Sequence, residues 1–140
     1  MRFMIMVRAN QDSEADVRPD EKLMAQMADY HQELAKAGAL LDASGLHPSR
    51  KGWRIRYSGE NRTVVDGPYS EAKELIAGYT IIQVKSREEA LAWTTRFPNP
   101  FPNSREAEIE VRPIKELEEL GRSDAVLRFR ELGVCFERQG

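Results

Sequence analysis

The stretch Arg2-Phe3-Met4-Ile5-Met6-Val7-Arg8 decides the fold, because it predicts a strand with two apolar faces. Successive side chains of a strand point to opposite faces, so Phe3 and Ile5 share one face. Met4 and Met6 then share the other. Helices packed on one side of a sheet cover only one of these faces. We expect a second subunit to cover the other, since large exposed apolar patches are rare on monomers.

The rest of the chain predicts helices and strands that complete an α+β domain. We expect helices at about 19–37 and from Ser86 onward, strands at 39–46, 76–84 and 107–114, and a hairpin of 53–57 with 62–65. The polar stretch 9–18 is typical of a loop. This order is a split β-α-β pattern. It predicts a ferredoxin-like antiparallel sheet with helices on one face.

Beyond the last strand, residues 116–140 form an expected C-terminal extension, with a helix at about 123–132. The domain itself is expected to span residues 1–115. The Pro-rich stretch 97–103 separates the second helix from the last strand and predicts an extended loop, because proline suits neither a helix interior nor a central strand.

Composition fits one domain and excludes several functional classes. The 140 residues include 21 basic and 23 acidic side chains, and this near balance gives no field to attract nucleic acid. We therefore expect no direct nucleic-acid binding. The single cysteine, Cys135, excludes an intramolecular disulfide and agrees with a cytoplasmic location. No apolar run approaches the roughly 20 residues of a membrane span.

One motif carries a family resemblance. The stretch Asp66-Gly67-Pro68-Tyr69-Ser70-Glu71-Ala72-Lys73-Glu74, followed by Gly78-Tyr79, resembles the DGPF-motif branch of the YCII-related family. The Met-rich first strand, the segment 89–93 and the closing stretch 110–113 also fit. The resemblance covers roughly residues 1–115. Tyr69 stands where the motif usually has phenylalanine, which keeps the aromatic ring.

The resemblance implies a dimeric α/β barrel, in which two ferredoxin-like sheets pack face to face, and hence a homodimer. For activity it implies two alternatives. One is a cofactor-independent enzyme that uses acid–base chemistry on a small molecule in a cavity of the dimer, with a His–Asp pair. The other is a non-catalytic ligand-binding or regulatory module associated with a sigma factor. Fold analogy does not choose between them.

His31 is the first candidate catalytic residue. It lies at the edge of the apolar stripe of the first helix, where an imidazole could act as a general base near neutral pH. The alternative is a boundary histidine bonded to a carbonyl or to water. The histidine of the family's His–Asp pair falls near Met27, so His31 is not a direct match to it.

Asp66 is the second candidate. Its carboxylate could act as a base or orient a histidine, but a turn former that bonds nearby backbone amides is favoured. We expect Gly67 and Pro68 to shape the turn and not to take part in chemistry.

Three further residues are candidates for substrate binding. Asp42 lies in an apolar strand and faces either the dimer cavity or a solvated edge. Arg112 shares a strand face with Glu110, which favours an ion pair over substrate anchoring. Tyr79 could offer a phenol to the cavity, although ordinary packing is favoured. No metal-binding, phosphate-binding or dinucleotide motif is present, so we expect neither metal nor cofactor.

Overall fold

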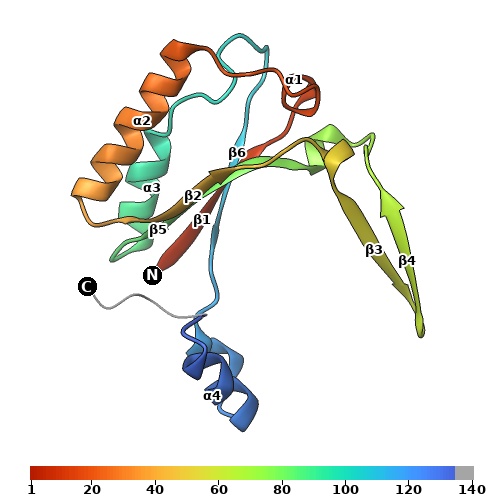
Figure 1. The fold of residues 1–140 in the computed structure, drawn as a ribbon. Coiled ribbons are helices and arrows are strands. Elements are labelled where there is room, and N and C mark those ends of the chain that lie inside the picture. The colour runs from red at the N-terminus through yellow and green to blue at the C-terminus, as the bar shows by residue number, and fades with distance from the viewer. Residues whose placement is uncertain (135–140) are drawn as a thin grey trace.

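The computed structural model describes residues 1–134 and contains one four-stranded sheet. Its strands are β1 (Arg2–Arg8), β2 (Leu40–Gly45), β5 (Ile76–Gln83) and β6 (Ile109–Pro113). They lie in the order β2-β5-β1-β6, and all neighbours are antiparallel. Helices α2 (Glu21–Lys36) and α3 (Arg87–Thr95) lie side by side on one face of this sheet (Figure 1). The α+β, ferredoxin-like fold is therefore confirmed.

Side-chain caps set where the helices begin. The Asp20 carboxylate accepts a hydrogen bond from the Leu23 amide at 2.8 Å, which starts α2, and the Ser86 hydroxyl does the same for α3. The expected loop at 9–18 is partly wrong, because it contains the short helix α1 (Gln11–Glu14). Asn10 and Ser13 form a reciprocal capping box there, which stabilises one helical turn in an otherwise polar stretch.

The hydrophobic core lies between the sheet and the two helices. Its buried members come from both layers: Phe3, Ile5, Tyr30, Leu34, Ala39, Ile82, Val84 and Ala90. The Tyr30 hydroxyl donates to the Trp93 carbonyl at 2.7 Å and so ties α2 to α3. Burial raises the pKa of Tyr30 to about 12, because a buried phenolate loses its hydration; nearby Arg96 acts in the opposite direction. This phenol is a structural donor.

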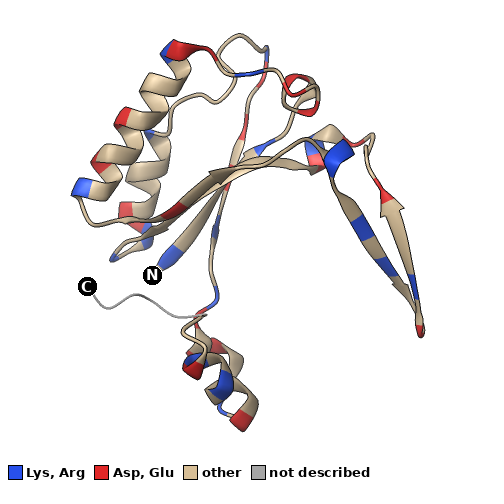
Figure 2. Cartoon of the chain, in the orientation of Figure 1, with Lys and Arg blue, Asp and Glu red and all other residues tan. Residues whose placement is uncertain are grey.

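A separate hairpin of β3 (Trp53–Ser58) and β4 (Asn61–Asp66) extends from one end of the sheet (Figure 1). Short 3-10 turns flank it, η1 (Ser49–Lys51) before and η2 (Ala72–Glu74) after. Two positions of β3, Arg54 and Arg56, are basic, and basic positions are coloured blue along this strand (Figure 2). The hairpin and the C-terminal helix both project away from the layer of α2 and α3.

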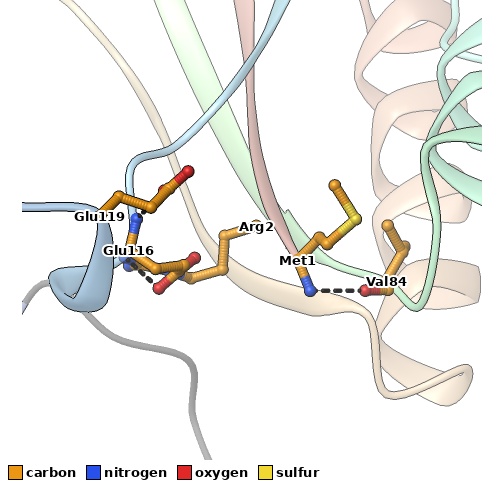
Figure 3. Close-up of polar contacts among 5 residues, drawn as sticks. All are labelled: Met1, Arg2, Val84, Glu116 and Glu119. Carbon is orange, nitrogen blue, oxygen red and sulfur yellow. Dashed lines mark hydrogen bonds and ion pairs between the residues drawn. The ribbon is translucent and has the colours of Figure 1, made fainter.

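The C-terminal extension contains η3 (Leu117–Leu120) and α4 (Asp124–Glu131), so the expected helix is present. Arg2 holds it to β1: Nε and one terminal nitrogen of the guanidinium donate to the two oxygens of Glu116 at 3.0 and 3.2 Å (Figure 3). Cys135 and the rest of the expected extension lie outside the described residues. Within residues 1–134, no helix has the length and apolarity needed to cross a membrane.

Candidate functional site

The face of the sheet opposite α2 and α3, called the open face, carries two rows of side chains that cross all four strands. Strand register defines both rows. The first row is Asp42, Ile81, Met4 and Arg112, and the second is Ser44, Tyr79, Met6 and Glu110. In each row the two central side chains are half-buried and mainly apolar, and polar residues occupy the outer strands. The open face thus has an apolar centre between two polar margins.

Asp42 and Tyr79 are the two candidate residues that the structure brings together. The Tyr79 hydroxyl donates to Oδ2 of Asp42 at 3.0 Å, and the Ala43 amide donates to Oδ1 at 2.8 Å. A shift in register between Leu40 and Asp42 moves the carboxylate onto the open face. The pair is exposed, so water can reach it.

Arg112 lies on the same face but at the opposite margin. The favoured ion pair between Arg112 and Glu110 is not formed. Glu110 instead accepts from Arg8 on the neighbouring strand, with Nη1 and Oε1 3.3 Å apart. Residues two apart on one strand are separated by about 7 Å, which is farther than neighbours across strands. Arg112 is left exposed.

His31 lies on the helix-covered side of the sheet, where its two ring nitrogens bridge a helix and a strand. Nδ1 is 2.7 Å from the Met27 carbonyl, and Nε2 is 2.9 Å from Oγ1 of buried Thr80. Because a carbonyl only accepts, Nδ1 carries the proton. In the neutral ring, Nε2 then accepts from the Thr80 hydroxyl. Both nitrogens are thus occupied, as expected for a boundary histidine.

Asp66 ends β4, and the turn after it forms the base of the hairpin. The Gly67 amide donates to the Gly52 carbonyl at 3.1 Å, and the Gly67–Pro68 bond is cis. A Cβ at Gly67 would lie 1.9 Å from the Ser49 carbonyl oxygen, so only glycine fits there. The expectation that this glycine shapes the turn therefore has a direct steric reason.

Tyr69 completes this base, which we call the hairpin joint (Ser49, Gly67 and Tyr69). The Tyr69 amide donates to Oγ of Ser49 at 3.1 Å, and its hydroxyl donates to the Val65 carbonyl at 2.8 Å. The guanidinium of Arg54 lies 3.6 Å from the centre of the Tyr69 ring. Glu14 accepts from both the amide and the hydroxyl of Ser49. The motif thus anchors the hairpin to the domain.

His31 and Asp66 are not brought together within one chain. The imidazole lies between α2 and β5, whereas Asp66 belongs to the hairpin, which leaves the sheet at the end away from α2 (Figure 1). The sheet also separates His31 from the open face, because Thr80 points to the helices and Tyr79 points away from them. The five candidate residues therefore occupy three separate places.

A large hollow at the end of β1, called the β1-end cavity, was not predicted. It measures about 1210 Å³ and lies where residues 8–11, 70–74 and 101–108 meet. Its charged lining comprises Arg8, Lys73, Arg105, Glu71, Glu74, Glu106 and Glu108. Phe101 supplies an aromatic wall. Three loops far apart in sequence form this cavity, and the only early signal was the charged stretch 70–74 after the turn.

Hydrogen bonds hold parts of this cavity in place. Arg8 donates to the Lys73 carbonyl and to Glu110, so its guanidinium joins β1 to the 70–74 segment. The Ser70 hydroxyl donates to Glu71 at 2.8 Å and is the main cause that lowers the pKa of this carboxylate, with a smaller contribution from Arg54. Glu71 is therefore ionised and ready to accept hydrogen bonds. Within residues 1–134, no group of three metal-ligating side chains is assembled.

Comparison with known proteins identifies relatives of the chain. A family model described as "YCII-related domain" matches residues 1–118. An uncharacterized protein of Rhizobium meliloti (strain 1021) is 30% identical over 95 residues, which are 68% of this chain and 75% of the relative.

A solved structure is similar at a TM-score of 0.44 and 14% identity, covering 83% of this chain and 95% of the other. It is 5-chloro-2-hydroxyhydroquinone dehydrochlorinase from Burkholderia phenoliruptrix AC1100, in complex with 2,5-dihydroxybenzoquinone.

Proposed function

The chain belongs to the YCII-related family, and we propose that it binds a small polar molecule in the β1-end cavity and works as a homodimer. The observation that supports binding is the cavity itself, a hollow of about 1210 Å³ formed by three segments that are far apart in sequence. It also combines an aromatic wall with convergent charged groups, as ligand sites commonly do.

The uncommitted charges of the cavity suggest the ligand class. Arg8 already has partners, and Glu108 lies 4.0 Å from it. The side chains of Lys73, Arg105, Glu74 and Glu106 have no hydrogen bond or ion pair with the described part of the chain. Two cations and two carboxylates facing one space suit a molecule that carries both charges. We therefore propose a small zwitterion with an apolar group that packs on Phe101.

A titration tests this ligand class. Amino acids with aromatic side chains should shift amide resonances of residues 8–11, 70–74 and 101–108 in two-dimensional NMR spectra, whereas matched acids and matched amines should bind more weakly. Glu106→Gln should lower the affinity for the zwitterion about tenfold, the effect of losing one charged contact. Glu88→Gln, on the outer surface of α3, is the matched control. Equal binding of acids, amines and zwitterions, or no binding at all, would contradict the proposal.

The homodimer is proposed from the open face. Met4, Met6 and Ile81 are only half-buried in one chain, and a second copy would remove them from water. Sedimentation velocity at increasing concentration measures this directly. A chain that stays monomeric at high micromolar concentration would contradict it.

Catalysis by His31 and Asp66 has less support than binding. The two side chains share no contact within one chain, and both imidazole nitrogens already have partners. An acid–base enzyme therefore needs a dimer that brings Asp66 of the partner subunit to His31, and it stays a prediction. So does the association with a sigma factor, for which the C-terminal extension, with Leu127 and Phe129 exposed on α4, is one docking surface. The DGPF branch likewise stays a prediction.

A further inference from the structure

We propose that the outer edge of β3 binds an extended acidic segment of another protein, which adds to the hairpin as a third, antiparallel strand. The inference goes beyond the cavity and the homodimer proposed above and rests on neither of them. Three observations support it: the unpaired backbone groups of β3, the apolar face of the hairpin, and the cations on its opposite face.

The first observation is that β3 has a strand beside it on one edge only, within residues 1–134. Gly52 and Gly67 continue the register of the hairpin as a hydrogen-bonded pair, in which the Gly67 amide donates to the Gly52 carbonyl at 3.1 Å. Such pairs alternate with non-bonded pairs in an antiparallel ladder, so the amides and carbonyls of Trp53, Ile55 and Tyr57 point away from β4. None of them has a partner in the described chain, and β3 contains no proline or bulge. This edge can therefore accept another strand.

The second observation is an exposed apolar face on the hairpin. Trp53, Ile55 and Tyr57 share this face because successive side chains of a strand alternate, and Val64 lies opposite Ile55 on the same face. All four side chains are exposed. An added strand would place every second side chain beside them. Apolar or aromatic side chains at those positions would remove this surface from water and form cross-strand pairs.

The third observation is that the opposite face of β3 carries Arg54 and Arg56 (Figure 2). Residues 49–58 contain four cations and no carboxylate, although the whole chain has a net charge of −2. Arg54 stacks on Tyr69, whereas Arg56 has no hydrogen bond, ion pair or ring contact with residues 1–134. The remaining side chains of an added strand would lie opposite these arginines, with Cβ atoms about 5 Å apart, where opposite charges stabilise a pair. The partner segment should therefore alternate acidic and apolar residues.

The same two arginines disfavour a second copy of β3 at this edge. The outward groups of Trp53, Ile55 and Tyr57 can pair with those of another β3 in an antiparallel ladder. In the register that pairs all three, Arg54 of each chain lies opposite the partner's Arg56. Like charges directly opposite each other destabilise a strand pair. The edge therefore selects against itself and in favour of an acidic strand.

The outer edge of β4 lacks this selectivity. A strand added there would lie opposite Asn61, Thr63 and Val65 on the face that carries the arginines of β3, and none of these three side chains is charged. An acidic segment would gain no ion pair from them. The charge pattern thus assigns the segment to β3.

Titration with designed peptides tests the proposal. The probe is a short synthetic peptide of alternating valine and glutamate, because its two kinds of side chain match the two faces of β3. One control peptide has lysine in place of glutamate. The other has the same composition as the probe, with the valines and glutamates in separate blocks. In NMR spectra of the full chain, the probe should slow hydrogen exchange at the amides of Trp53, Ile55 and Tyr57, and leave the amides of β4 unchanged.

Arg56→Gln removes the charge that has no partner and should weaken binding of the probe about tenfold. Arg87→Gln, exposed on α3, is the matched control and should leave the affinity unchanged. Both side chains are exposed, and an unchanged NMR spectrum outside the substituted region confirms that each variant is folded. Equal binding of either control peptide, protection of β4 in place of β3, or no binding would overturn the proposal. So would protection of β3 that rises with protein concentration in the absence of peptide, because a second copy would then occupy the edge.

Discussion

The four-stranded sheet and the β3–β4 hairpin are both antiparallel but end in opposite environments. In both, successive side chains point to opposite faces. Ile5 in the sheet is 0% exposed, whereas Trp53 and Tyr57 in the hairpin are 66% and 67% exposed. Alternation therefore shows which side chains share a face. It does not show what covers that face.

The difference extends to what stabilises each region. The sheet is held by its core against α2 and α3, and a two-stranded hairpin without such a core is marginal in water. The hairpin depends instead on its joint, where Ser49, Gly67 and Tyr69 fix its base. We expect the two regions to respond to substitution in different ways.

The largest effect is expected in the sheet. Ile5→Ala removes a fully buried side chain and leaves a cavity, so the free energy of unfolding should fall by about 2–5 kcal/mol. Ile55→Ala, in the hairpin, is the matched control and should change it by about 0.5 kcal/mol. Urea denaturation measures both. Equal losses would mean that the hairpin is buried as deeply as the sheet, which would end the contrast.

The next effect is expected at the hairpin joint. Gly67→Ala forces a methyl group against the Ser49 carbonyl, which should cost about 1–3 kcal/mol and open the base of the hairpin. Hydrogen exchange should quicken for the amides of residues 53–66, while those of β1 and β5 stay protected. Gly45→Ala, where a Cβ meets nothing within 4 Å, is the control. Unchanged exchange in the hairpin would show that the joint does not hold it.

A third effect depends on pH. Burial raises the pKa of Tyr30 from 10.0 to about 12, so between these values the unfolded chain loses a proton that the folded chain keeps. Stability from this group is therefore complete below pH 10 and falls as the pH rises towards 12. Chemical denaturation across this window should show a slope that Tyr30→Phe reduces. Tyr57→Phe, in the hairpin, should leave the slope in place. If this control removed the slope, the titrating group would lie in the hairpin and would not be Tyr30.

The smallest effect on the isolated chain is expected for Trp53→Ala, about 0.5 kcal/mol or less, because the indole is exposed. Measuring the loss at low and at high protein concentration sharpens the comparison. A loss that grows with concentration would show that the hairpin contacts a second copy, whereas a constant small loss would leave it free in the assembly.

Local signals in the sequence were enough to predict most of the fold. Asp20 and Ser86 begin helices through their caps, and the alternating strands lie close to where they were expected. The turn at Gln11–Glu14 was missed because a capping box outweighed the weak helix preference of the stretch. Local pattern was sufficient wherever the deciding interaction lies within a few residues.

The candidate site was less predictable because it depends on distant contacts. The pairing of Asp42 with Tyr79 follows from strand register, and the choice of Arg8 as the partner of Glu110 follows from strand order. Neither can be read from spacing in one strand. Asp66 was favoured as a turn former, with orientation of a histidine as the alternative; the hairpin that carries it leaves the sheet, and nothing in its alternation indicates that direction. The β1-end cavity joins three loops and had no pattern of its own.

The crowded carbonyl of Ser49 gives the Asp-Gly-Pro-Tyr signature a mechanical meaning. A sequence signature is usually searched for as the mark of a reaction, but here its glycine is required by a neighbouring oxygen, and its tyrosine clamps the backbone of β4. On this reasoning, a chain that carries the signature should have a hairpin anchored at its base in the same way, whatever the chain binds. A search for the signature then finds proteins that share this way of anchoring a hairpin. The residues that carry their chemistry have to be sought elsewhere in each of them.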